Sequence, residues 1–156
     1  MDIQNDEFTK LTASFAKHQV RYLIVGGFAV NRYGFKRTTG DLDIYLQDTL
    51  QNRRNLIEAL AEMNYGRFEE LLRVPILPGY CEILMENGMY ADLMTQIKGL
   101  DPTEFDTHFK MATIDEINGS QVRFLHYNNL IDNKIATGRS KDKIDVEELE
   151  KLRNKL

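Results

Sequence analysis

Hydrophobic residues along the 156-residue chain recur with two different periods. In residues 6–18 and 49–63 they lie three and four positions apart, which predicts two amphipathic helices. Residues 41–46 alternate strictly between polar and apolar, which predicts a strand whose Leu42, Ile44 and Leu46 face the core. Residues 21–25 form a mostly apolar run that stops at two glycines, as expected of a buried strand that ends in a turn.

Turn signals place the remaining elements. Asn87-Gly88 and Asn118-Gly119 each predict a tight hairpin in which both turn residues have positive φ. Residues 65–78 contain two prolines and receive no firm element. The predicted strands are 80–85, 90–95, 112–117 and 121–125, and the predicted helices are 28–33, 127–137 and 142 to the end. This order predicts one α/β (α+β) domain over residues 1–156, with a mixed sheet flanked by helices.

Composition narrows the classes of function. A content of 42% hydrophobic and 28% charged residues is ordinary for a folded domain, and the formal charge of -4 argues against binding nucleic acid through non-specific phosphate attraction. The single cysteine, Cys81, excludes an intrachain disulfide or a CxxC pair and is expected to fill core space. With no leader pattern and no run of about 18 apolar residues, we expect a cytoplasmic protein with no membrane partner.

The residues that carry chemistry lie around the glycine turn. Asp41 and Asp43 are two apart on a predicted strand, so their carboxylates share a face and could hold hard divalent cations. Gly26-Gly27 ends the preceding strand and allows close backbone approach to a ligand, while the helix that follows offers free N–H groups to phosphate. Asp92, in an otherwise apolar strand, is the best third carboxylate for two-metal phosphoryl chemistry.

Three separated motifs resemble the minimal nucleotidyltransferases of the DNA polymerase β-like superfamily. They are GGFAV at 26–30, RTTGDLDI at 37–44 and LIDNKIATGRSKD at 130–142 followed by Asp145. Agreement of three motifs in the expected order is more specific than any one of them. The small bacterial proteins that carry such motifs include relatives of abortive-infection toxins.

The resemblance implies transfer of a nucleoside monophosphate from a nucleoside triphosphate, with ATP as one such substrate, to a hydroxyl acceptor. It implies two Mg²⁺ ions held by Asp41, Asp43 and Asp92, the last as third ligand or base. Triphosphate contacts would come from five residues: Gly26, Gly27, Arg37, Thr39 and Lys134. Many superfamily members have Gly-Ser where this chain has Gly26-Gly27. Because the serine hydroxyl is missing, phosphate binding is expected to depend more on backbone N–H groups and cations.

Several alternatives stay open at this stage. The chain could instead be an interaction protein of the same fold, such as a toxin-antitoxin component with little chemistry of its own. Arg37 could neutralise Asp41 or Asp43 rather than bind phosphate. Asp142 and Asp145 could be the N-cap and first-turn acid of the last helix. The acceptor could be a small molecule, a protein or an RNA end, and the small size favours a partner subunit or a homo-oligomer that completes its site.

Overall fold

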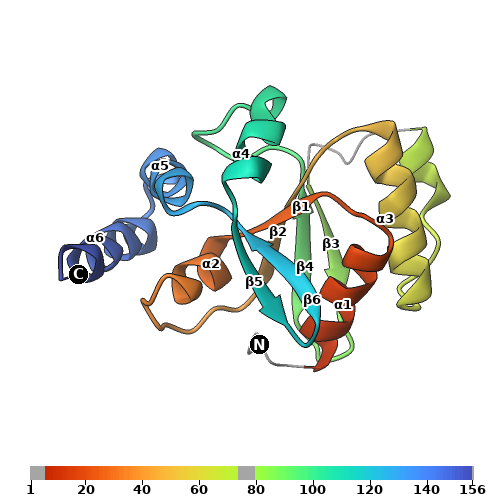
Figure 1. Cartoon of the computed structure of the whole chain (residues 1–156), viewed down its shortest axis with the longest axis horizontal. Helices are drawn as coiled ribbons and strands as arrows, with labels where there is room; N and C mark the ends of the chain where they lie inside the picture. The colour runs from red at the N-terminus through yellow and green to blue at the C-terminus, as the bar shows by residue number, and fades with distance from the viewer. Residues whose placement is uncertain (1–5, 74–79, 156) are drawn as a thin grey trace.

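The computed structural model describes residues 6–73 and 80–155, and it contains a six-stranded mixed sheet with the strand order β3-β4-β2-β1-β6-β5 (Figure 1). The strands are β1 Tyr22–Val25, β2 Leu42–Leu46, β3 Tyr80–Leu84, β4 Tyr90–Met94, β5 Thr113–Ile117 and β6 Ser120–Phe124. The helices are α1 Asp6–Lys17, α2 Gly26–Arg32, α3 Leu50–Glu62, α4 Phe105–Met111, α5 Tyr127–Thr137 and α6 Ser140–Asn154, with short 3₁₀ turns at Glu69–Leu72 and Pro102–Glu104.

The helices cover the sheet from different directions (Figure 1). Helices α1 and α3 pack against each other on one side, and α1 also contacts β6. Helices α2, α5 and α6 lie on the other side, where α2 contacts β1 and β2 and α5 packs on α6. Helix α4 packs over Tyr45 of β2 through Phe105, whose ring centroid is 5.1 Å from that of the tyrosine.

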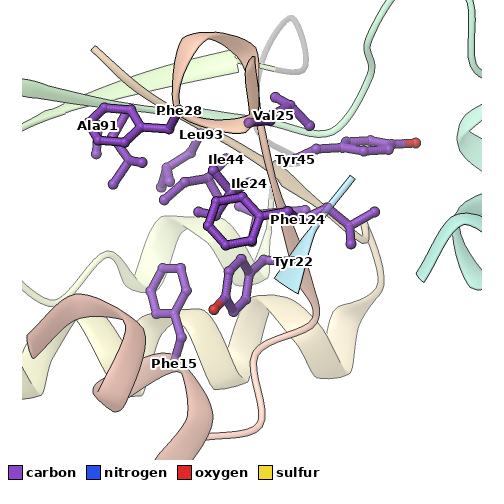
Figure 2. Packing of buried hydrophobic residues seen from close by; sticks show 14 of the residues in the cluster. Phe15, Tyr22, Ile24, Val25, Phe28, Ile44, Tyr45, Ala91, Leu93 and Phe124 are labelled. Atoms are coloured by element: carbon purple, nitrogen blue, oxygen red, sulfur yellow. The ribbon is translucent and has the colours of Figure 1, made fainter. Parts of the chain in front are cut away.

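The core forms where apolar side chains of neighbouring strands meet in register. Ile24 pairs with Phe124 of β6 on one side and with Ile44 of β2 on the other, and Ile44 pairs with Leu93 of β4. All four are at most 1% exposed. Phe15 from α1 packs edge-on against Tyr22 beneath this row (Figure 2). Burial of this row helps to fix the sheet register, because a slip of one residue would move its side chains to the opposite face of the sheet.

Most predicted elements are confirmed, with small shifts of their ends. Leu42, Ile44 and Leu46 are buried as predicted, and Thr49 caps α3 by accepting a hydrogen bond from the Asn52 amide at 3.1 Å. Helix α5 spans the predicted residues and ends at Gly138, which has a φ of +62°. Helix α2 begins at Gly26, two residues before its predicted start. Helix α4 was not predicted, and part of the unassigned 65–78 segment lies outside the described residues.

The two hairpins differ from each other. Asn118 and Gly119 both have positive φ and form the predicted two-residue turn between Ile117 and Ser120. The Asn87-Gly88 prediction is wrong in detail, because only Gly88 has positive φ. The loop there has three residues, 86–88, and is closed by a 2.8 Å hydrogen bond from the Met85 amide to the Met89 carbonyl. The Asn87 side chain accepts a hydrogen bond from the Met89 amide at 3.0 Å, which stabilises this longer turn.

Within the described residues, none of the helices is both long enough and apolar enough to cross a lipid bilayer.

Candidate active site

An acidic row crosses the sheet one residue away from the apolar core row. Asp43 of β2 pairs directly with Asp92 of the parallel strand β4, and Asp92 pairs with Glu82 of β3. Paired residues on adjacent strands project from the same face, with their Cβ atoms about 5 Å apart. Asp41 precedes Asp43 by two residues. The predicted meeting of Asp43 and Asp92 therefore follows from strand register.

Burial and mutual repulsion set the protonation of this row. Asp92 is 7% exposed, Asp43 is partly buried and Asp41 is exposed. The pKa of Asp43 is raised to about 7, chiefly by burial and then by the Asp92 charge, a hydrogen bond with Asp92 and the Asp41 charge, while Lys134 opposes the shift. Below neutral pH the Asp43–Asp92 pair therefore retains a shared proton, which it loses as the pH rises through this pKa, as expected when two carboxylates occupy one site.

The glycine turn packs against two of the predicted site residues. A Cβ on Gly26 would lie 2.1 Å from Oδ2 of Asp43, and a Cβ on Gly27 would lie 2.4 Å from Oγ1 of Thr39. Gly26 also has a φ of +64°, a conformation that other residues rarely adopt. The two glycines thus allow the Asp43 carboxylate and the Thr39 hydroxyl to approach the start of α2.

A second cluster of charges joins the β1–β2 connection to α5 and α6. Arg37 donates two hydrogen bonds to Asp145, from Nε at 2.7 Å and from Nη2 at 2.9 Å. The Lys134 ammonium lies 2.9 Å from Asp145 and 3.2 Å from Asp142. Arg139 donates to Asp142 through Nε at 2.7 Å and Nη2 at 3.0 Å. Lys134, Asp142 and Asp145 are at most 3% exposed, so these charges neutralise one another in the interior.

This cluster corrects two sequence-based interpretations. Arg37 pairs with Asp145 and not with Asp41 or Asp43. The N-cap of α6 is Arg139, and Asp142 is the third helical residue, which accepts a hydrogen bond from the Arg139 amide at 3.1 Å. Asp145 lies beyond the first turn of α6. Its role is to hold Arg37 and Lys134, a pairing across more than a hundred residues that no local pattern indicates.

The two clusters meet at Asp43. Lys134 lowers the pKa of Asp43, and the Asp43 charge contributes to a raised pKa for Arg139, for which the hydrogen bond with Asp142 is the larger cause. The side chain of Arg139 is 57% exposed, whereas that of Arg37 is 23% exposed. Arg139 is therefore the cation of this cluster that is most accessible to a ligand beside the acidic row.

Sequence reasoning missed Arg139 and Glu82 as candidate site residues. Arg139 belongs to the late motif, but only the fold of the α5–α6 hairpin places its charge near Asp43. Glu82 lies beside Asp92 because the β3–β4 loop has three residues. A two-residue turn at Asn87-Gly88 would have paired Glu82 with Leu93, on the other face.

The donor set suits a hard divalent cation, although the side chains are not arranged as a finished metal site. Among residues 6–73 and 80–155, no group of three His, Cys, Asp or Glu side chains is close enough together to hold an ion as it stands. Asp43 and Asp92 instead share a hydrogen bond. A cation between them would replace the shared proton, and carboxylate oxygens are the ligands that Mg²⁺ prefers.

Two cavities lie away from the acidic row. One of about 450 Å³ is lined by Arg21, Phe109 and Arg123 near the start of β1. Another of about 570 Å³ lies between Tyr33, Tyr127 and α6. We identify the candidate site by its chemistry and register, because neither cavity contains any of the three aspartates.

Comparison with solved structures identifies the fold. The chain is similar to the lincosamide antibiotic adenylyltransferase LnuA in its lincomycin-bound form, with a TM-score of 0.62 and 18% identity over 97% of this chain and 99% of that one. It is also similar to TM1012 of Thermotoga maritima, a candidate nucleotidyltransferase, with a TM-score of 0.59 and 17% identity over 96% and 91% of the two chains.

A third similar structure is an antigenic nucleotidyltransferase-like protein from Paracoccidioides brasiliensis, with a TM-score of 0.52 and 15% identity over 96% of this chain and 76% of that one. No protein-family model matches the sequence, and no curated protein matches it. The chain has the minimal nucleotidyltransferase fold, in agreement with the resemblance of its motifs.

Proposed function

We propose that this chain transfers a nucleoside monophosphate from a nucleoside triphosphate to a hydroxyl group, with divalent metal held by Asp41, Asp43 and Asp92. The observation that supports this most directly is the pairing of Asp43 with Asp92 across β2 and β4, with Asp41 immediately before the start of β2. Like charges at this spacing are unfavourable unless a proton or a cation lies between them. A metal–triphosphate complex supplies such a cation.

In the proposed reaction, the acceptor oxygen attacks the α-phosphorus in line with the bond to the bridging oxygen. A new oxygen–phosphorus bond forms, the bridging bond breaks, and pyrophosphate leaves with the electron pair. Bound Mg²⁺ would stabilise the charge on the phosphate oxygens and on the leaving group. Asp92 lies at the Glu82 side of the pair and is the group that would accept the hydroxyl proton.

The surrounding cations divide into two roles in this proposal. Arg139, the most exposed of them, would contact the triphosphate directly. Arg37 and Lys134 would support the site without contacting the triphosphate, because their nitrogens already bind Asp145 and Asp142. These contacts hold α5 and α6 beside the acidic row. The N–H groups at the start of α2 and the Thr39 hydroxyl complete the proposed phosphate contacts.

Calorimetric titration with each nucleoside triphosphate and Mg²⁺ tests the proposal without knowledge of the acceptor. We expect saturable binding to the native chain, and a loss of roughly 10–100-fold or more in affinity for Asp43→Asn and Asp92→Asn. Release of pyrophosphate by slow transfer to water should fall in the same variants, by roughly 10²–10³-fold for each lost electrostatic contact.

Asp6→Asn is the matched control, since it removes an exposed aspartate at the start of α1, outside the acidic row. It should bind triphosphate as the native chain does. Absence of binding by the native chain in the presence of Mg²⁺, or unchanged affinity in Asp43→Asn and Asp92→Asn, would contradict the proposal and favour an interaction protein.

A further inference from the structure

Beyond Asp92, the same sheet face carries exposed apolar side chains on β3 and β4. Leu84 and Tyr90 pair across β3 and β4 on that same face, and they are 59% and 42% exposed. Glu82, between Leu84 and the acidic row, is also exposed. On the opposite face of these strands, Ala91 and Leu93 are at most 3% exposed. Exposed apolar side chains at neighbouring positions, next to a reacting centre, are a common feature of ligand surfaces.

The hairpin that carries this surface is held firmly. The Glu7 carboxylate of α1 accepts hydrogen bonds from the Glu86 and Asn87 amides, the second at 2.8 Å, and the Tyr65 hydroxyl donates to Glu7 at 2.6 Å. The position of Glu82, Leu84 and Tyr90 relative to Asp92 is therefore set before any ligand arrives. Such preorganisation reduces the entropic cost of binding.

Charge indicates what this surface would accept. Among the described residues, no cation forms an ion pair or a hydrogen bond with the Glu82 carboxylate, whereas the buried acids Asp142 and Asp145 each have two cationic partners. The positive charge of a metal ion at Asp43 and Asp92 would be balanced by the negative triphosphate. The negative charge of Glu82, at the edge of the row, would then have no cation to neutralise it. A ligand with a cationic group matches Glu82, and an apolar body matches Leu84 and Tyr90.

We infer that this surface, formed by Glu82, Leu84 and Tyr90, binds the acceptor, and that the acceptor is a small alcohol with an apolar or aromatic body and a protonated amine. The inference rests on the proposed function, because it places the acceptor hydroxyl beside Asp92. Glu82 acts as a specificity residue that binds the amine and takes no part in the bond changes at phosphorus.

Three probes that share one phenyl carbinol group test the inference: 2-amino-1-phenylethanol, 1-phenyl-1,2-ethanediol and mandelate. They differ only in carrying a positive, neutral or negative substituent. We would titrate each into the chain loaded with Mg²⁺ and a non-hydrolysable triphosphate analogue and follow binding by NMR. The amine should bind about two- to fivefold more tightly than the diol, as expected for a solvent-accessible ion pair, and mandelate should bind most weakly.

Glu82→Gln should abolish the difference between amine and diol while Mg²⁺–triphosphate affinity stays unchanged. Glu116→Gln, which removes an exposed glutamate on the opposite edge strand β5, should preserve the difference. Tyr90→Ser should weaken all three probes alike. Equal binding of the three, a preference for mandelate, or binding of none of them to the loaded chain overturns the inference and leaves the nucleotide site intact.

A loss of metal–triphosphate affinity in Glu82→Gln would also overturn it, since Glu82 would then be a metal ligand. The triphosphate titration of the native chain is performed first, so that failure of the proposed function is recognised separately from failure of the acceptor assignment.

Discussion

Two groups of charged side chains lie next to each other in this fold, and the pKa values of their buried carboxylates shift in opposite directions. In the first group Asp43 and Asp92 pair on the sheet, Asp41 precedes β2, and the pKa of Asp43 rises to about 7. In the second group Asp142 and Asp145 are more deeply buried, yet hydrogen bonds from Arg139, Arg37 and Lys134 outweigh the effect of burial and lower their pKa values. Burial alone therefore does not decide the charge state of an acid.

The contrast suggests a division of roles. The second group is complete within the chain, because each buried carboxylate has two cationic partners. It ties the β1–β2 connection to α5 and α6, which is a structural role. In the first group, burial and the neighbouring carboxylates raise the pKa of Asp43 instead. Perturbed acids of this kind are what the proposed metal site requires.

The strongest test of this contrast is Asp145→Asn. Arg37 and Lys134 would each lose a buried partner, so we expect the free energy of unfolding to fall by about 3–5 kcal/mol. Asp115→Asn is a matched control, since Asp115 also accepts a forked pair of hydrogen bonds, from Arg32, but is 26% exposed. That variant should lose at most about 1 kcal/mol. Equal losses in chemical denaturation would show that burial does not distinguish the two pairs.

The pH dependence of stability measures the other group. The folded chain keeps the Asp43 proton up to a pKa of about 7, whereas the unfolded chain releases it near pH 4. The folded state binds more protons in this window, so the free energy of unfolding of the metal-free chain should fall by about 2–3 kcal/mol between pH 5 and pH 8. Denaturation in the presence of a chelator checks this prediction.

The same titration of Asp43→Asn provides the control, because the amide has no proton to lose in this range. The variant should lack most of the fall, and at pH 8 it should be more stable than the native chain. If the free energy of unfolding depended on pH equally in both proteins, its decrease would arise from other groups. The carboxylates of the first group would then be adequately neutralised within the fold.

The smallest expected effect concerns Arg139, which belongs to the second group but faces solvent. Arg139→Lys keeps the charge and the backbone hydrogen bond to Asp142 but loses the forked contact. We expect unfolding free energy to fall by less than about 1 kcal/mol and triphosphate affinity to fall more than it does in Arg153→Lys, a control at the far end of α6. A loss of stability as large as that of Asp145→Asn would place Arg139 among the buried structural charges instead.

The parts of this site that could be predicted are those set by local spacing. Asp43 lies on β2 as predicted, whereas Asp41, predicted as the first strand residue, precedes it, and Gly26 follows β1 where the apolar run stops. The pairing of Arg37 with Asp145 spans 108 positions, so only the folded chain reveals it. Helix α4 was missed because its seven residues are too few to establish a helical period, although Phe105 and Phe109 do lie one turn apart.

The loop at residues 86–88 has a consequence that reaches beyond the hairpin. Its length determines the pairing between β3 and β4, and it thereby determines which β3 side chain stands next to Asp92. A turn formed by Asn87-Gly88 alone would place Ile83 opposite Asp92 in place of Glu82, while the three aspartates stayed in place. A change in the β3–β4 turn, which is far from the reacting phosphate, is thus a route by which proteins of this fold could come to modify different acceptor molecules.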